Sequence, residues 1–225
     1  MKNTIKYLIL LIIYLVCGVN LQAQNYTFRN VVMSDGLSGL LVNAIYKDSE
    51  GFVWLGTDNC LDRFDGVKVR HYEFRGVDSG RKKRVNCITE TADNQLWVGN
   101  GIGLWRLNRA NGQLERIVPE KIDFAVNTLL PDGDILYIGT EKGLFIQKDG
   151  QLLQVLTDRN MLAACNRIMD LCLNEDKSAL WLATVQGLFS YSLKDGKIDS
   201  WHFQENVPEA DYFRCLTRIG ETLYL

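Results

Sequence analysis

The 225-residue sequence has few of the residues from which catalytic and metal sites are usually built. It contains two histidines, His71 and His202, and neither stands near a nucleophile elbow or at a spacing typical of metal ligands. Its cysteines include no Cys-x-x-Cys pair, and their number is odd once Cys17 of the N-terminal segment is set aside. Neither a zinc site nor a disulfide framework is therefore indicated. We expect no catalytic residue, no metal and no cofactor, and we expect that the chain is not itself an enzyme.

The sequence also lacks a strong excess of charge of either sign. The formal net charge is −2, and it becomes more negative without the N-terminal Lys2 and Lys6. The one basic cluster, Arg81-Lys-Lys-Arg84, is more typical of a solvated loop than of a contact for an acidic ligand. The composition therefore gives no general attraction to nucleic acid or to an anionic membrane.

Apolar runs of membrane length are missing as well. Residues 7–19 form an apolar run after a basic start, but a bilayer-spanning helix needs about 20 residues. Because Leu21-Gln-Ala23 offers a small residue at a cleavage point, residues 1–23 are predicted to be an export signal peptide. An uncleaved N-terminal anchor is the alternative. A lipoprotein is less favoured, since Cys17 follows a valine rather than a small residue.

What the sequence does contain is a repeat. An aromatic residue, an apolar residue, a small residue and Thr or Asn return at intervals of 40 to 44 residues, and in each complete copy a leucine follows seven positions after the aromatic residue. These aromatic residues, which we call the anchors, are Trp54, Trp97, Tyr137, Trp181 and, in a last partial copy, Tyr224. Each complete copy also has an Asp-Gly or Asn-Gly pair, at positions 65–66, 111–112, 149–150 and 195–196. A period of about 40 to 50 residues is typical of the blades of a β-propeller.

Each copy divides into four strands. An alternating segment such as Val42–Ile45 precedes the anchor strand, the leucine begins the third strand, and the Asp-Gly or Asn-Gly pair predicts a tight two-residue turn into the fourth. The sequence thus predicts an all-β fold over residues 24–225: an incomplete β-propeller of four-stranded antiparallel blades, with about four blades and the start of a fifth. The anchors should fill the space between blades, and the small residues after them should relieve crowding near the shared axis.

The first copy also resembles a known family. The resemblance to the two-component-regulator propeller repeat is carried by Asp35-Gly-Leu-Ser38, Val42-Asn-Ala-Ile45, the segment from Asp48 to Thr57, and Leu61-Asp-Arg-Phe-Asp-Gly66. Cys60 and Ala183 depart from the pattern, since each replaces the usual glycine. The resemblance implies the N-terminal periplasmic sensor part of a Bacteroidetes hybrid two-component histidine kinase, whose full length would add more propeller, a membrane span, the kinase, a receiver and a DNA-binding module.

The resemblance also implies a function and partners. Such sensors typically detect oligosaccharides and control genes for polysaccharide use. It implies an oligosaccharide ligand, self-association of propellers in the full-length protein, no nucleic acid contact by this segment, and attachment to the inner membrane only through the missing C-terminal part. The alternative is a free-standing secreted propeller that binds carbohydrate or degrades polysaccharide, because the fold does not decide the function.

Two further expectations concern the end of the chain. Because Leu225 stands in the middle of an expected strand, we expect the N-terminal part of a longer sensor; the alternative is a small propeller closed by pairing residues 26–32 with the last blade. Trp201, Tyr212 and Phe213 lie in a long segment between the last two copies, where packing explains them least. We therefore name these three aromatic residues as candidates for contact with a sugar ligand.

Overall fold

The computed structural model describes residues 5–7, 28, 30–77, 83–117, 120–156, 167–201 and 212–225. Its contacts divide the chain into two units, Met1–Val31 and Val32–Leu225, and all the described strands belong to the second. Apart from residues 5–7, the expected signal peptide lies outside the described residues. Among the helices of the described residues, none has the length and apolar character that a membrane crossing requires.

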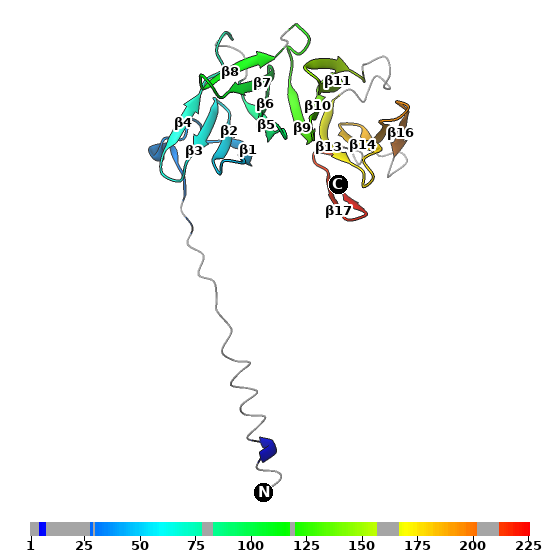
Figure 1. Ribbon diagram of the computed structural model, residues 1–225, viewed down its shortest axis with the longest axis horizontal. Coiled ribbons are helices and arrows are strands. Elements are labelled where there is room, and N and C mark those ends of the chain that lie inside the picture. Colours follow the sequence, from blue (N-terminus) through cyan, green and yellow to red (C-terminus); the bar gives the residue numbers. More distant parts are fainter. Residues whose placement is uncertain are drawn as a thin grey trace. The chain divides into compact units, whose positions relative to one another are not determined.

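The second unit consists of antiparallel sheets, each formed by strands that are consecutive in the chain (Figure 1). Blade 1 comprises β1 (Val42–Lys47), β2 (Val53–Thr57), β3 (Leu61–Phe64) and β4 (Val69–Tyr72). Blade 2 comprises β5 (Val85–Glu90), β6 (Leu96–Asn100), β7 (Gly103–Asn108) and β8 (Gln113–Ile117). A short 3-10 helix, η1 (Met33–Asp35), precedes them.

The later sheets repeat the same order. Blade 3 comprises β9 (Val126–Asp132), β10 (Ile135–Thr140), β11 (Gly143–Lys148) and β12 (Gln151–Gln154). Blade 4 comprises β13 (Ile168–Leu173), β14 (Ala179–Thr184), β15 (Gly187–Ser192) and β16 (Ile198–Trp201). The fifth sheet has two described strands, β17 (Thr217–Ile219) and β18 (Thr222–Tyr224). The predicted four blades and the start of a fifth are thus confirmed.

Neighbouring blades meet through their first strands. β1 contacts β5, β5 contacts β9, and β9 contacts β13. Asparagine amides reinforce these contacts, since Asn86 Nδ2 donates to Val126 O at 2.9 Å and Asn127 Nδ2 donates to Ile168 O at 2.8 Å. Side-by-side packing around the first strands is the arrangement that a propeller requires.

The small residues after the anchors lie where the next blade presses in. A Cβ added at Gly56, Gly99 or Gly139 would lie 2.4, 2.6 or 2.8 Å, respectively, from a side-chain atom on the first strand of the next blade. The side chains it would meet belong to Val85, Val126 and Ile168, in that order. The expected crowding is therefore confirmed. It comes from a β-branched residue of the next blade and, at Gly99 and Gly139, also from Cys87 and Thr128 on the first strand of the same blade.

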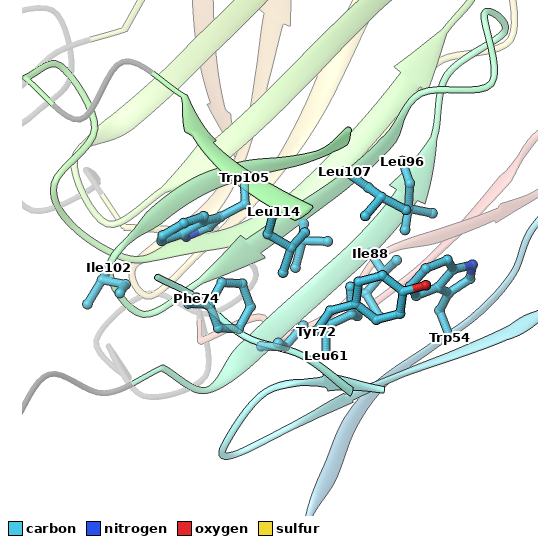
Figure 2. Packing of buried hydrophobic residues seen from close by; sticks show 12 residues of the cluster. Trp54, Leu61, Tyr72, Phe74, Ile88, Leu96, Ile102, Trp105, Leu107 and Leu114 are labelled. Carbon is cyan, nitrogen blue, oxygen red and sulfur yellow. The ribbon is translucent and has the colours of Figure 1, made fainter. Parts of the chain in front are cut away.

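Three anchors, Trp54, Trp97 and Tyr137, are buried between blades as expected, whereas Trp181 is partly buried and Tyr224 is 51% exposed. Trp54 is fully buried, and it packs with Leu61 and Tyr72 of its own blade against Val85 and Ile88 of blade 2 (Figure 2). Its indole Nε1 donates to Asp48 Oδ2 at 2.7 Å, so the polar end of the ring is also satisfied. Burial of an aromatic side chain of this size contributes about 3 kcal/mol.

The expected two-residue turns form in one blade. In blade 3, Asp149 and Gly150 join β11 to β12 directly, and both have the positive φ angles (51° and 73°) of a tight hairpin turn. In the other three blades the loop before the fourth strand is longer, so the prediction was wrong there. In blade 1 the Asp65 carboxylate accepts from the backbone N–H groups of Val67 and Lys68, and an Asx turn replaces the tight turn.

Candidate functional site

Blade 1 contains a fully buried carboxylate at a position where the other blades carry aromatic rings. Asp62 lies on β3 directly opposite His71 on β4, and its side chain has no exposed surface. Asp62 directly follows the repeat leucine of blade 1. The residues that follow the repeat leucines of blades 2, 3 and 4 are the buried Trp105, Phe145 and Phe189. Because a buried charge is costly unless it is paired, Asp62 requires partners that an aromatic ring does not.

Four groups surround the Asp62 carboxylate. Its Oδ2 accepts hydrogen bonds from the backbone N–H of Ser38 at 2.8 Å and from Ser38 Oγ at 2.7 Å. Its Oδ1 lies 2.7 Å from His71 Nδ1 and accepts from Cys60 Sγ at 3.3 Å. Ser38 Oγ is also 2.9 Å from Thr57 Oγ1, so Ser38 forms hydrogen bonds to both middle strands of blade 1, β2 and β3. We call Ser38, Cys60, Asp62 and His71 the blade-1 cluster.

The Cys60 thiol is held in its protonated form. Burial raises its pKa to about 12, and the neighbouring Asp62 charge acts in the same direction. A catalytic cysteine needs the opposite environment, with a lowered pKa and a base that removes its proton. Here Cys60 and His71 both bond to Asp62. The geometry therefore does not support a thiolate nucleophile.

The backbone at Cys60 also differs from that of the later blades. The glycines equivalent to Cys60 in blades 2, 3 and 4 are Gly103, Gly143 and Gly187. Their φ angles are +150°, +110° and +142°, in a region that other residues rarely adopt. Cys60 is not among the described residues with positive φ. Blade 1 thus enters its third strand in a conformation that accepts a side chain, and that side chain points to Asp62.

The blade-1 cluster adjoins a cavity of about 570 Å³. Cys60 is the buried member of the blade-1 cluster that lines it, whereas the His71 side chain is 47% exposed. The residues that line the cavity are Ser38, Asn59, Cys60, His71, Glu73, Phe74, Arg75, Gly76, Val77 and Lys83. Sulfur, nitrogen and oxygen donor atoms thus converge beside a space large enough for a small ligand.

The structure explains two of the three predicted ligand residues by packing. Trp201 is the last residue of β16 and pairs with Leu188, as Tyr72 pairs with Leu61 in blade 1. Its ring lies 5.8 Å from that of the anchor Trp181, whereas the Trp54 and Tyr72 rings are 5.1 Å apart. Trp201 therefore belongs to the blade and not to the segment between blades, and its placement by sequence was wrong.

Phe213 and Tyr212 differ in their surroundings. Phe213 packs against the cluster of Ala183, Leu188 and Leu216, and its backbone N–H donates to Thr184 O at 3.1 Å. Tyr212 is 43% exposed, and the Arg214 guanidinium lies 5.7 Å from its ring centre. A ligand role for Trp201, Tyr212 and Phe213 stays a prediction, and of the three Trp201 and Tyr212 are the exposed ones.

Comparison with known proteins identifies the first repeat. Residues 36–59, which include Ser38 and the strands β1 and β2, match the model of the two component regulator propeller. Over these residues the chain is similar to the two component regulator propeller. The family resemblance inferred from the sequence is thereby confirmed. The match ends one residue before Cys60, so it includes only Ser38 of the blade-1 cluster.

A curated relative and several solved structures are similar to this chain. Histidine kinase P4 of Formosa agariphila is 32% identical over 79 residues, which cover 35% of this chain and 6% of that protein. Extracellular domains of two putative hybrid two component systems from B. thetaiotaomicron align with TM-scores of 0.63 and 0.69 at 24% and 21% identity. These alignments cover 78% and 86% of this chain and 24% and 28% of those chains.

A lyase provides a third structural likeness. Virginiamycin B lyase from Staphylococcus aureus aligns with a TM-score of 0.62 at 14% identity, covering 80% of this chain and 61% of the lyase. At such identities the alignments establish the shared propeller fold and nothing about the ligand. The chain spans 6% of the curated relative and about a quarter of the aligned B. thetaiotaomicron chains.

Proposed function

We propose that this chain is the N-terminal sensor part of a hybrid two-component system, and that it contributes to the binding of an oligosaccharide. The observation that carries the proposal is the match of residues 36–59 to the two component regulator propeller, on a fold shared with the extracellular domains of such systems. The chain itself supplies a binding surface and no catalytic step. The raised pKa of Cys60 supports this assignment, since it opposes a nucleophilic role.

The location and partners belong to the same proposal. Residues 1–23 direct the chain to the periplasm, and the full-length protein is held in the inner membrane by a later segment. Propellers of that protein associate with one another, and the signal reaches a histidine kinase that controls genes for polysaccharide use. The extracellular origin of the aligned domains supports export.

Sequencing of the coding DNA beyond the codon for Leu225 tests the sensor assignment. We expect the reading frame to continue through further propeller repeats, a membrane span and a histidine kinase. A stop codon at that position would instead favour a free-standing secreted propeller. This result is independent of any ligand, so it separates the assignment to a sensor from the choice of an oligosaccharide.

The ligand is tested by titration of the full chain with a panel of oligosaccharides in a calorimeter. We expect Trp201→Ala and Tyr212→Ala to weaken binding at least about tenfold, because aromatic rings are the natural stacking surfaces for sugars. Tyr224→Ala is a matched control, since Tyr224 is 51% exposed and Trp201 is also 51% exposed. Equal affinity in all three variants, with each protein folded, would remove these residues from the proposal.

A further inference from the structure

Three donor atoms of different kinds converge in blade 1. The Sγ of Cys60, a carboxylate oxygen of Asp62 and a ring nitrogen of His71 all lie within 4.8 Å of one another. Sulfur, nitrogen and oxygen donors of this kind are those that bind zinc, and zinc sites with three protein ligands keep a fourth position for water or another molecule. We propose that Cys60, Asp62 and His71 form a zinc-binding site.

The two distances from Asp62 Oδ1 fit a tetrahedral ion after a small adjustment. Zinc bonds of about 2.1 Å to nitrogen and oxygen and about 2.3 Å to sulfur place neighbouring ligand atoms about 3.4 to 3.6 Å apart. Asp62 Oδ1 is already 3.3 Å from Cys60 Sγ. It is 2.7 Å from His71 Nδ1, so this pair must open by about 0.7 Å. The half-exposed His71 side chain has room to move, while Cys60 and Asp62 stay in place.

The surroundings of Asp62 orient it as a ligand. Both hydrogen bonds from Ser38 go to Oδ2, which leaves Oδ1 directed at Cys60 and His71. Hydrogen bonds of this type to a ligating carboxylate fix its orientation and raise metal affinity. The ion replaces the thiol proton and the ring proton as the group that joins the three side chains.

The cavity gives the ion an entry path and an open coordination position. Ser38, Cys60 and His71 line it, together with Glu73 two residues beyond His71. Arg75 and Lys83 also line it, and their positive charges oppose a divalent cation. The Cys60 and Asp62 ligands and the Glu73 carboxylate supply compensating negative charge, so the site is nearly balanced once zinc is bound.

The cluster is not needed to build a blade. Blades 2 to 4 form the same four-stranded sheets with different residues at all three ligand positions. In place of Cys60 they have Gly103, Gly143 and Gly187, and in place of Asp62 they have Trp105, Phe145 and Phe189. Opposite the aromatic rings, where blade 1 has His71, the strand pairing places Arg116, Gln154 and Ser200. Three metal-binding residue types thus replace the repeat residues together, which a purely structural role does not require.

A metal titration of the full chain tests the proposal. The chain is first freed of metal with a chelator, the chelator is removed, and Co(II) and then Zn(II) are added. We expect one Co(II) per chain, a thiolate-to-cobalt charge-transfer absorption, and loss of that absorption when Zn(II) displaces the cobalt. Cys60→Ser should abolish the absorption, and His71→Asn should weaken Zn(II) binding at least about tenfold. Ser38→Ala should weaken it about tenfold, because it removes one of the hydrogen bonds that orient Asp62.

Two controls keep the test specific. Cys215→Ser and Cys87→Ser remove cysteines outside the cluster and should leave the absorption and the affinity unchanged. His71 is half-exposed, so His71→Asn is expected to remain folded even if Cys60→Ser does not, and circular dichroism checks each variant. The proposal is overturned if the full chain takes up no Co(II), if folded His71→Asn binds Zn(II) as tightly as the unchanged chain, or if Cys215→Ser removes the signal.

Discussion

Blades 1 and 2 solve the same packing problem with different chemistry. In blade 2 the third strand, β7, carries the buried Trp105, whose indole Nε1 donates to Asn100 Oδ1 at 3.2 Å. In blade 1 the same position holds the buried Asp62, whose oxygens bind Ser38, Cys60 and His71. Blade 2 gains mainly from apolar burial, whereas blade 1 gains from hydrogen bonds that must all be made. The difference shows that the repeat fixes the sheet and leaves this position open to a polar role.

The largest effect should come from breaking the apolar side of this comparison. Trp105→Ala removes a ring that is 1% exposed and packs edge-on against Phe74 at 4.9 Å. We expect a loss of about 3–5 kcal/mol in the free energy of unfolding, because truncation leaves a large cavity between blades 1 and 2. Urea unfolding of the full chain followed by circular dichroism measures it. Trp201→Ala is the control, since Trp201 is 51% exposed, and an equal loss there would contradict the argument.

The next largest effect concerns the contact between these blades. A Cβ at Gly56 would stand 2.4 Å from Val85 Cγ1 and 2.8 Å from Val85 Cβ. We expect Gly56→Ala to lower the free energy of unfolding by about 1–3 kcal/mol, because an inserted methyl group must push the first strand of blade 2 away. The same urea titration measures the loss.

The matched control for Gly56→Ala is Ala183→Gly in blade 4. Ala183 occupies the equivalent position and is fully buried against Leu188 and Leu216. Its replacement by glycine introduces no clash, so a loss of no more than about 1 kcal/mol is expected. Equal unfolding midpoints for Gly56→Ala and the unchanged chain would refute the crowding argument.

The sequence predicts the blades better than it predicts the sites, and the reason is physical. Strand periodicity and the phase of the anchors are local signals, so four blades and the interblade role of Trp54 follow from them. The blade-1 cluster depends on which residues face each other across β3 and β4, and His71 is nine residues from Asp62. A signal was nevertheless present, because Asp62 stands in phase with Trp105, Phe145 and Phe189.

The misplacement of Trp201 has a related cause. The anchors, the repeat leucines and the Asp-Gly or Asn-Gly pairs mark the phase of the repeat, whereas the fourth-strand residues opposite the leucines differ from blade to blade. The pairing of Leu61 with Tyr72 and of Leu188 with Trp201 shows that Trp201 is the blade-4 counterpart of Tyr72. Trp201 is nevertheless half exposed, whereas Tyr72 is buried. Loop lengths before the fourth strand differ among blades, so sequence distance alone did not reveal the equivalence.

A smaller effect is expected from breaking the polar side of the comparison. Asp62→Asn has a single neutral oxygen: if this oxygen accepts from Ser38, the N–H₂ group faces His71 and Cys60, to which it can only donate. We expect a loss of about 1–2 kcal/mol in the free energy of unfolding, because hydrogen bonds to a charged acceptor become weaker or unpaired. Urea unfolding in the presence of a chelator measures it without a contribution from bound metal. Thr91→Ser, at another buried polar position, should change stability less.

The smallest effect concerns the rate at which Cys60 is alkylated, and this rate tests the environment of the thiol in blade 1 directly. In the chain freed of metal by a chelator, the pKa of Cys60 is raised to about 12 by burial, so at pH 8 its thiol is almost entirely protonated. Since the thiolate is the reactive form, Cys60 should react with iodoacetamide at least about tenfold more slowly than the exposed Cys215. Its rate should rise with pH as long as the fold persists, which peptide mapping by mass spectrometry follows. Labelling of Cys60 as fast as that of Cys215 at pH 8 would mean that the thiol is neither buried nor bonded to Asp62, and the contrast between blade 1 and its neighbours would lose its chemical basis.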